Sequence, residues 1–346
     1  MFVRPVARCR FGSGRKQHTR RGPSASKSLM RSIDRALIAL AVILVTLFGA
    51  EMSVFGQRAA PAAAGRQIKV QTEPNATVWL NGVSFGRTDK EGVLEIKNAP
   101  AGSYTIKVRA AGFKESSKPL LAAQKGLVEI ALVKTTDEAE LAFQEGERLA
   151  YSDREKSAEA YNKAIRLRPN YVDAYIGLAR VLSEAQDIEG AANAIRSAKK
   201  LKPGLAEASA VEGRIYKDSG EEAKAIAAFK RAIAEGRGFQ PEAYAGLGLL
   251  YKEKAEGSGG SGDMENEEIN YTEAAKNLRS SLKQLSGAPD AIVIYQLLGL
   301  VYERQKKHAE AIAVYEEFLR FFPNSAEATA VRSFIVQLKK DQLPQQ

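Results

Sequence analysis

A helix-ending phrase that recurs after 34 residues is the feature that most constrains this fold. The stretch AYNKAIRLRPN reaches Pro169, and AANAIRSAKKLKPG reaches Pro203. Proline stops a helix because it lacks an amide hydrogen and its ring clashes with the preceding turn. Residues of similar size recur at the same interval, as in Leu182 and Tyr216, Ala191 and Ala225, Ile195 and Phe229, and Ala198 and Ala232. Local helix propensity does not explain a fixed interval, so the sequence predicts a repeat architecture.

The order of residue types within one interval indicates the kind of repeat. Paired helices need small residues where they approach closely and large residues that fill the gaps between them. One unit reads Tyr175, Leu178, Ala179, Leu182, Ala191, Ile195, Ala198 and Pro203, and another reads Tyr295, Leu298, Gly299, Tyr302, Ala311, Tyr315, Phe318 and Pro323. This order resembles the tetratricopeptide repeat. The resemblance implies helix pairs stacked into an all-α solenoid with a concave groove.

About five such units are expected over residues 135–324. The first is degenerate, since Glu145 stands where the pattern has leucine. The fourth is interrupted, because Gly248 and Gly299 are 51 residues apart, 17 more than one repeat. The excess corresponds to residues 255–270, an acidic, Gly/Ser-rich stretch that we expect to form a flexible insert. Residues 325–346 are expected to form a capping helix and a tail.

Residues 67–134 show the alternation typical of short strands. The segments IKVQT, TVWLNG, VLEIK, YTIKVRA and LVEIALV are separated by glycine, proline and the turn signal Asn81-Gly82. They predict a small antiparallel β-sandwich. The stretches PNATVWLNGVSFGRT and AGSYTIKVRAAGF resemble the PEGA domain, a small sandwich of bacterial surface and envelope proteins, although Pro-Asn-Ala replaces the usual Pro-Glu-Gly-Ala. TDKEG at 88–92 looks more like the related carboxypeptidase-regulatory sandwich.

The expected fold class is therefore multidomain α+β, a small all-β PEGA-like sandwich followed by an all-α tetratricopeptide-repeat solenoid. Ahead of the sandwich we expect a linker at 57–66, a signal peptide or signal anchor at 36–56 and a basic tail at 1–35. Residues 36–50 are uncharged and mostly apolar, which is short for a membrane span of ~20 residues and suits a signal peptide.

Two outcomes of export stay open. Cleavage near Gln57 or Gly65 would release a soluble protein, whereas an uncleaved segment would anchor it and make the membrane a partner. Met30 is an alternative start, because it leaves a signal peptide of usual proportions. In either case we expect a periplasmic or other extracytoplasmic location.

Composition and motifs argue against several classes of function. Residues 1–35 hold ten basic residues and one acid, which leaves 41 basic and 40 acidic residues in the rest of the chain. Nucleic-acid binding is therefore not expected. The two histidines, His18 and His308, lack neighbours spaced as metal ligands or catalytic partners. GSGGSG at 257–262 lacks the lysine and the strand of a phosphate loop. We expect no enzyme activity, no cofactor and no metal.

The candidate binding residues come from the family resemblance. In tetratricopeptide repeats the variable positions of each first helix line the concave surface. Carried over by phase, they are Asp173, Ile176, Arg180, Ala210, Arg214, Lys217, Ala245, Leu249, Lys252, Gln296, Leu300 and Glu303. Trp79, the only tryptophan, alternates with Val78 and Leu80 and is expected to face away from the sandwich core, where it could stack on a sugar or a partner.

These features predict a non-enzymatic scaffold of the bacterial cell envelope that binds a protein or peptide in its groove. The alternative is a glycan- or cell-wall-binding protein that acts through the sandwich face around Trp79. The sequence does not identify the partner or the oligomeric state.

Overall fold

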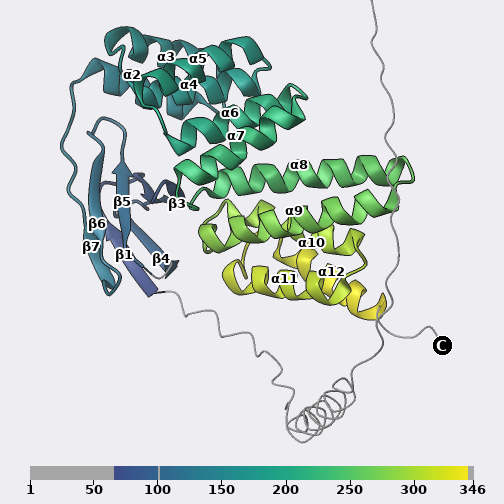
Figure 1. The fold of residues 1–346 in the computed structure, drawn as a ribbon. Coiled ribbons are helices and arrows are strands. Elements are labelled where there is room, and N and C mark those ends of the chain that lie inside the picture. The colour runs from purple at the N-terminus through teal and green to yellow at the C-terminus, as the bar shows by residue number, and fades with distance from the viewer. Residues whose placement is uncertain (1–65, 100–101, 342–346) are drawn as a thin grey trace, which may run out of the picture. The chain divides into compact units, whose positions relative to one another are not determined.

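The computed structural model describes residues 66–99 and 102–341. The basic tail, the apolar run and the linker up to residue 65 lie outside this range, so what we expect of them stays a prediction. Among the described residues, no helix is both long and apolar enough to cross a membrane. Within the same range, a β region of two small sheets is followed by eleven α-helices (Figure 1).

Seven short strands form the β region. They are β1 (Arg66–Gln71), β2 (Thr77–Leu80), β3 (Val83–Arg87), β4 (Val93–Ala99), β5 (Tyr104–Arg109), β6 (Ser116–Leu120) and β7 (Gly126–Glu129). One sheet has the order β4-β1-β7 and the other the order β3-β2-β5-β6. Inward-facing residues of both sheets, such as Val70, Val78 and Val108, are fully buried in one apolar cluster. The two-sheet arrangement predicted from the alternating residues is therefore confirmed.

Two features of the sheets differ from the prediction. β1 pairs antiparallel with β4 but parallel with β7. β7 follows β6, which belongs to the other sheet, so no hairpin joins β1 to β7. Only a hairpin connection would require these two neighbours to be antiparallel. The sequence pattern also fails to identify β6, because Pro119 argues against a strand. β6 lies at the sheet edge, where the missing amide hydrogen of proline costs no ladder bond.

Five helix pairs and a final helix form the array. They are α2 (Glu138–Leu149) and α3 (Arg154–Leu167), α4 (Val172–Glu184) and α5 (Ile188–Leu201), α6 (Ala206–Asp218) and α7 (Glu222–Glu235), α8 (Pro241–Gly260) and α9 (Met264–Leu285), α10 (Ala291–Arg304) and α11 (His308–Phe321), and α12 (Ala328–Asp341). We call the members of each pair the first and second helix.

The helices of a pair approach closely where the repeat pattern places a small residue. A Cβ atom added to Gly146 would lie 2.7 Å from the ring of Tyr161, and one added to Gly213 would lie 2.5 Å from the ring of Phe229. Both distances are shorter than any van der Waals contact between carbon atoms. The close approach inferred from the alternation of small and large residues is therefore confirmed.

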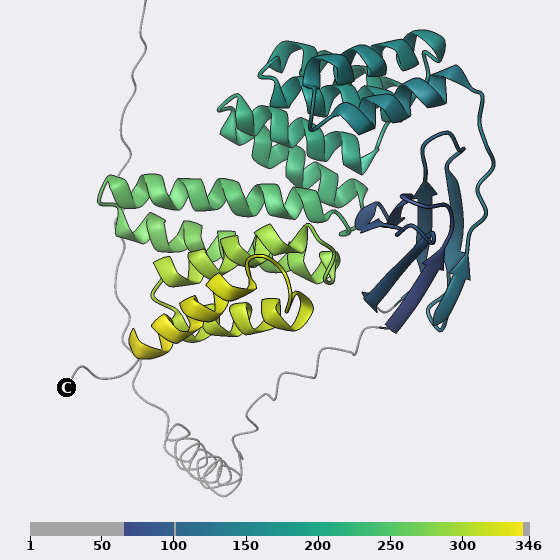
Figure 2. The same cartoon turned by 180° about the vertical axis from the view of Figure 1, so that it is seen from behind.

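The expected flexible insert at 255–270 is wrong. α8 continues to Gly260 and α9 begins at Met264, so only residues 261–263 connect two helices of 20 and 22 residues (Figures 1 and 2). Glycine disfavours a helix in isolation. Here the two helices pack along each other and bury Ala255, Tyr271 and Ala274. Because packing supplies most helical stability in proteins, it outweighs the local glycine content.

The two ends of the array are built differently. Glu145 of α2 is exposed and pairs with Arg148 at 2.6 Å. No helix precedes α2 in the array, so this position does not require the leucine of the repeat pattern. At the other end, α12 lies where a capping helix is expected. It buries Val331 and Leu338 and leaves Phe334 half exposed.

Candidate functional site

The groove positions carried over from the family fall into two groups. At least partly accessible are Asp173, Arg180, Arg214, Lys217, Ala245, Leu249, Lys252, Gln296, Leu300 and Glu303. Ile176 and Ala210 are only 3% and 0% exposed, so the assignment of these two residues to the groove surface is wrong. The reason is that α4 packs against α2 and α6 as well as against α5. These neighbours bury part of the face that an isolated helix pair would leave open.

Ion pairs hold most of the charged groove residues. Arg180 of α4 donates through both guanidinium arms to Glu242 of α8, at 2.7 and 2.6 Å, and lies 3.4 Å from Glu207 of α6. Further pairs are Arg214 with Glu184 at 2.9 Å, Lys217 with Glu253 at 3.1 Å, and Lys252 with Glu256 at 2.8 Å. These bases therefore cannot bind an anionic partner without weakening an internal ion pair.

The Arg180–Glu242 pair stays charged although only about 30% of each side chain is exposed. Burial by itself raises the pKa of the Glu242 carboxyl, but the charge and the hydrogen bonds of Arg180 outweigh that effect and lower the pKa below its usual value. Sequence reasoning identified Arg180 and missed Glu207 and Glu242. The only signal for the two acids is that each is the second residue of a first helix, where a carboxylate interacts favourably with the helix dipole.

A cavity of about 1190 Å³ lies between the β region and several first helices. Its walls carry aromatic and charged side chains from both regions, including Trp79, Arg87, Arg109, Arg180, Glu207 and Glu242. This volume exceeds the range of about 300–1,000 Å³ that is usual for small-molecule pockets. Of the residues predicted from sequence, the cavity brings together Trp79, Arg180 and Ala245.

Trp79 faces away from the sandwich core and is half-buried, whereas Val78 and Leu80 are 0% and 1% exposed. Its ring carries two cations at cation–π distance. The Nζ of Lys107 lies 5.1 Å and the Cζ of Arg109 lies 5.4 Å from the ring centroid. A sugar stacking on the covered face would have to displace these cations.

Arg109 joins the β region to the first repeat. Its side chain is only 7% exposed, and its two terminal nitrogens form ion pairs with Glu147 of α2 and with Glu115. The guanidinium also lies 4.5 Å from the ring centroid of Phe143. Asp173, predicted as a groove residue, lies 3.9 Å from the same guanidinium. Nothing in the local sequence distinguishes Arg109 from other strand cations, so the sequence analysis missed this junction.

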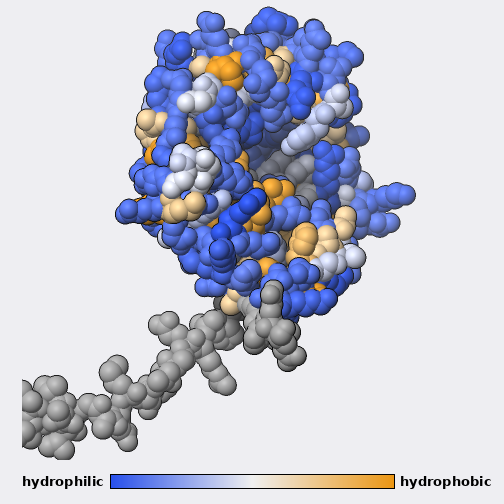
Figure 3. Space-filling view, turned by 90° about the vertical axis from the view of Figure 1, so that its right-hand side faces the viewer, coloured by the Kyte–Doolittle hydropathy of each residue, from blue (hydrophilic) through white to orange (hydrophobic). Residues whose placement is uncertain are grey.

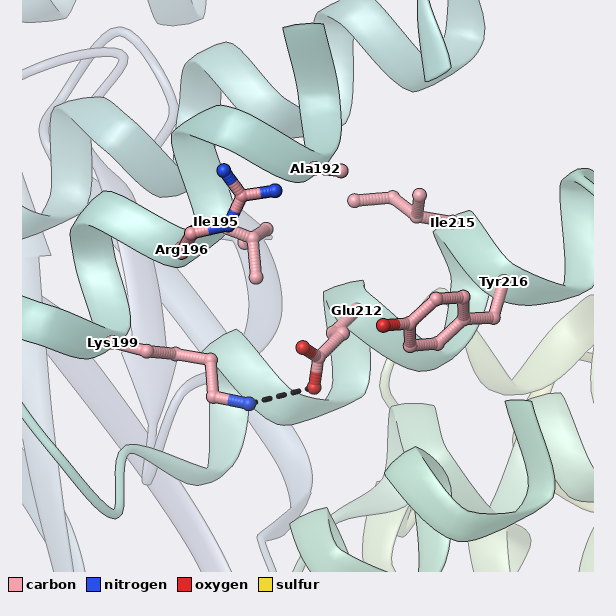
Figure 4. Close-up of a pocket in the computed structure, with 7 residues that line it drawn as sticks. All are labelled: Ala192, Ile195, Arg196, Lys199, Glu212, Ile215 and Tyr216. Carbon is pink, nitrogen blue, oxygen red and sulfur yellow. Dashed lines mark hydrogen bonds and ion pairs between the residues drawn. The ribbon is translucent and has the colours of Figure 1, made fainter. Parts of the chain in front are cut away.

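A smaller cavity of about 150 Å³ separates α5 from α6 (Figure 4). The side chains that face each other across it are Ala192, Ile195, Arg196 and Lys199 of α5 and Glu212, Ile215 and Tyr216 of α6. In this unit Ser209 and Glu212 stand where the second unit has Tyr175 and Leu178, 34 residues earlier. Of these two residues Glu212 lines the cavity and Ser209 does not, so the space lies beside the position that lacks the aliphatic side chain.

The described residues offer little to catalysis or metal binding. Within them, no group of three or more His, Cys, Asp or Glu side chains is arranged to hold a metal ion. His308 begins α11, and its Nδ1 has no hydrogen-bond partner in the described part of the chain. On the face shown in Figure 3, hydrophilic residues predominate and hydrophobic residues form small separate groups. That face therefore does not resemble a large apolar interface.

Comparison with known families agrees with the repeat assignment. Three tetratricopeptide-repeat models match residues 147–206, 206–234 and 295–325. In a search of curated proteins no sequence matches the chain.

Among the solved structures that match parts of this chain is yeast Tom70, with 18% identity and a TM-score of 0.48 over 60% of this chain and 41% of that one. The APC/C hetero-tetramer Cut9-Hcn1 gives 17% identity and a TM-score of 0.46, over 60% of this chain and 38% of that one. YrrB, described as a TPR protein with an unusual peptide-binding site, gives 16% identity and a TM-score of 0.36, over 57% of this chain and 94% of that one. This chain thus spans less than half the length of the Tom70 and Cut9-Hcn1 chains.

Proposed function

Because this chain is a tetratricopeptide-repeat protein with a small N-terminal β-sheet region, we propose that it is a non-enzymatic scaffold for another protein. Its groove holds a protein or peptide segment, and the protein acts outside the cytoplasm, in the bacterial cell envelope. The cavity of about 1190 Å³ between the β region and the first helices is the observation that carries this proposal. A cavity of that size, lined by several successive repeats, suits a chain segment.

The ion pairs between successive first helices support the same function. Arg180, Glu207 and Glu242 connect α4, α6 and α8, and Arg214 with Glu184 connects α4 to α6 a second time. Such pairs fix the spacing of the repeats, so the groove is largely formed before a partner arrives. Preorganisation of this kind lowers the entropic cost of binding.

The groove can be tested without breaking the ion pairs. Leu141 of α2 and Ala245 of α8 line the cavity and are at least partly accessible. We expect L141Q/A245Q to weaken binding of a partner captured from native envelope extract by at least about tenfold, because a buried contact would then have to desolvate two amide side chains. The matched control is V293Q, at a residue of α10 that is 57% exposed and does not line the cavity. Equal partner affinity of L141Q/A245Q and the wild type would refute the groove assignment.

The envelope location rests on the apolar run at 36–50 and on the PEGA-like motifs. Mass spectrometry of the mature N-terminus from fractionated cells tests it. A start near Gln57 or Gly65 in a soluble extracytoplasmic fraction supports a diffusing adaptor, and an intact apolar run in the membrane fraction supports a tethered one. Full-length protein confined to the cytoplasm contradicts both.

Glycan binding through Trp79 is the alternative proposal. It is favoured by the position of Trp79 in the cavity wall and opposed by the cations that lie over its ring. Retention of the full chain on peptidoglycan, abolished in W79A and kept in the W79F control, would support this alternative. Absence of retention would eliminate it.

A further inference from the structure

The cavity between the β region and the first helices has two walls that are held together by specific contacts. The side-chain amide of Gln144 in α2 accepts from the amide of Gly112 at 2.9 Å and donates to the carbonyl of Phe113 at 2.7 Å. The ion pair between Arg109 and Glu147 joins the same two regions. The wall formed by β2 and β3 is thus part of the site and is not a neighbouring domain on a free hinge.

The helical wall of this cavity carries an excess of negative charge. Arg180 is engaged by both oxygens of Glu242, so its longer contact with Glu207, at 3.4 Å, leaves that carboxylate poorly neutralised. Asp290 also lines the cavity and forms no ion pair within the described part of the chain. Burial and the nearby charge of Glu242 both raise the pKa of Asp290. Among the described residues, Arg180 is the one cation within ion-pair distance of these three carboxylates, and it reaches only Glu207 and Glu242.

The cavity also offers apolar surface. Trp79 and Val83 line it from the β region, and Tyr151, in the loop between α2 and α3, lines it from the helical side and is 92% exposed. A small diamine or polyamine offers positive charge but no apolar side chains for this surface.

We propose that this cavity receives a segment of a partner protein in which a lysine or arginine is flanked by apolar residues. The basic side chain lies against Glu207, Glu242 and Asp290, and the apolar neighbours lie against the wall of Trp79. This inference rests on the proposed scaffold function and specifies the partner chemistry of the same groove. It follows from charge complementarity, since a single added cation offsets part of the carboxylate excess.

The test is selection of random 12-residue peptides on the full chain, followed by titration of the selected peptides. Trp79 is the only tryptophan of the protein, so its fluorescence reports occupancy of the cavity directly. We expect selected peptides to be enriched in lysine and arginine beside apolar residues, to change the Trp79 emission, and to bind more weakly as salt rises.

A charge-removing variant and a matched control sharpen this test. E207Q/D290N should weaken binding at least about tenfold, while E265Q/E310Q, which removes the same charge from two exposed positions that do not line the cavity, should not. Thermal unfolding of each variant shows whether the fold is kept. Peptides without excess basic residues, or peptides that leave the Trp79 emission unchanged, would overturn the proposal. So would equal displacement by spermidine, which would identify a small polycation as the occupant.

The outcomes separate this inference from the proposed function. If L141Q/A245Q, which changes two residues of the cavity wall, abolishes peptide binding and E207Q/D290N does not, the scaffold function stands and the basic-segment inference fails. If the wild-type protein selects no peptide, both fail.

Discussion

The third unit (α6, α7) and the fifth unit (α10, α11) are both pairs of packed helices, but side chains of different types occupy corresponding positions in them. In the fifth unit, Tyr295 lies 6.0 Å from the ring of Phe318 and 6.4 Å from that of Phe321, so aromatic rings occupy the space between helices. In the third unit, the position that corresponds to Tyr295 is Ser209, and a cavity of about 150 Å³ lies close by. The repeat geometry therefore tolerates the loss of the aromatic ring at this position.

Polar groups compensate for that loss in the third unit. Glu212 accepts from Lys199 at 2.7 Å and also pairs with Arg231, whose Nε donates to Ser209 at 3.2 Å. All three charged side chains keep contact with water, at 20%, 28% and 41% exposure. A network of this kind costs less desolvation than a buried one, but it contributes less than apolar packing. The comparison teaches that the fifth unit fills these positions with buried apolar side chains, whereas the third unit has partly solvated ion pairs there and keeps the rest of its apolar core, such as Phe229.

The largest expected effect comes from removing a buried aromatic ring from the fifth unit. F318A should lower the free energy of unfolding by about 3–5 kcal/mol, because Phe318 is 0% exposed and its ring contacts Tyr295 and Phe322. Urea unfolding monitored by circular dichroism measures the change. The control F334A removes the same ring from a position that is 50% exposed and should cost much less. Similar losses for F318A and F334A would contradict the account of the fifth unit.

A smaller effect, a rise in the free energy of unfolding, is expected when an apolar residue replaces Glu212 in the third unit. E212L places an aliphatic side chain beside the cavity and should raise the unfolding free energy by about 1 kcal/mol, because Lys199 and Arg231 are exposed enough to be solvated without their partner. E212A removes the charge without filling the space and should not stabilise. A lower melting temperature of E212L than of E212A would show that the ion pairs outweigh the missing packing.

The smallest expected effect is a pH dependence of the polar contacts between units. Since the pKa of Glu242 is lower in the folded protein than its usual value, the pair with Arg180 stabilises the fold above that usual value and loses its effect as the pH falls through the folded pKa. Between about pH 5 and pH 3 the wild type should lose more stability than E242Q, which cannot titrate. E310Q, at an exposed carboxylate of α11, serves as the control. Parallel curves for the wild type and E242Q would contradict the lowered pKa.

Much of the array could be predicted because its information is local and periodic. The 34-residue interval marks the helix ends, and the small residues Gly146 and Gly213 mark the close approaches that the structure confirms. The two-sheet β region follows from alternation in the same way. The insert at 255–270 could not be predicted, because its glycines signal flexibility locally and only the packing of α8 along α9 makes the segment helical.

The candidate site, in contrast, depends mostly on contacts that the sequence does not reveal. The family resemblance carried by the sequence placed Arg180 on the accessible face of a first helix, and the alternation of residues in the sequence by itself determined that Trp79 faces away from the sandwich core. Only the tertiary structure decided that Arg180 binds Glu242, 62 positions later in the chain, and that Arg109 bridges to α2. The physical reason is that periodicity fixes which face of an element is buried, whereas the partner of a charge depends on how successive helices and the sheet are placed in space.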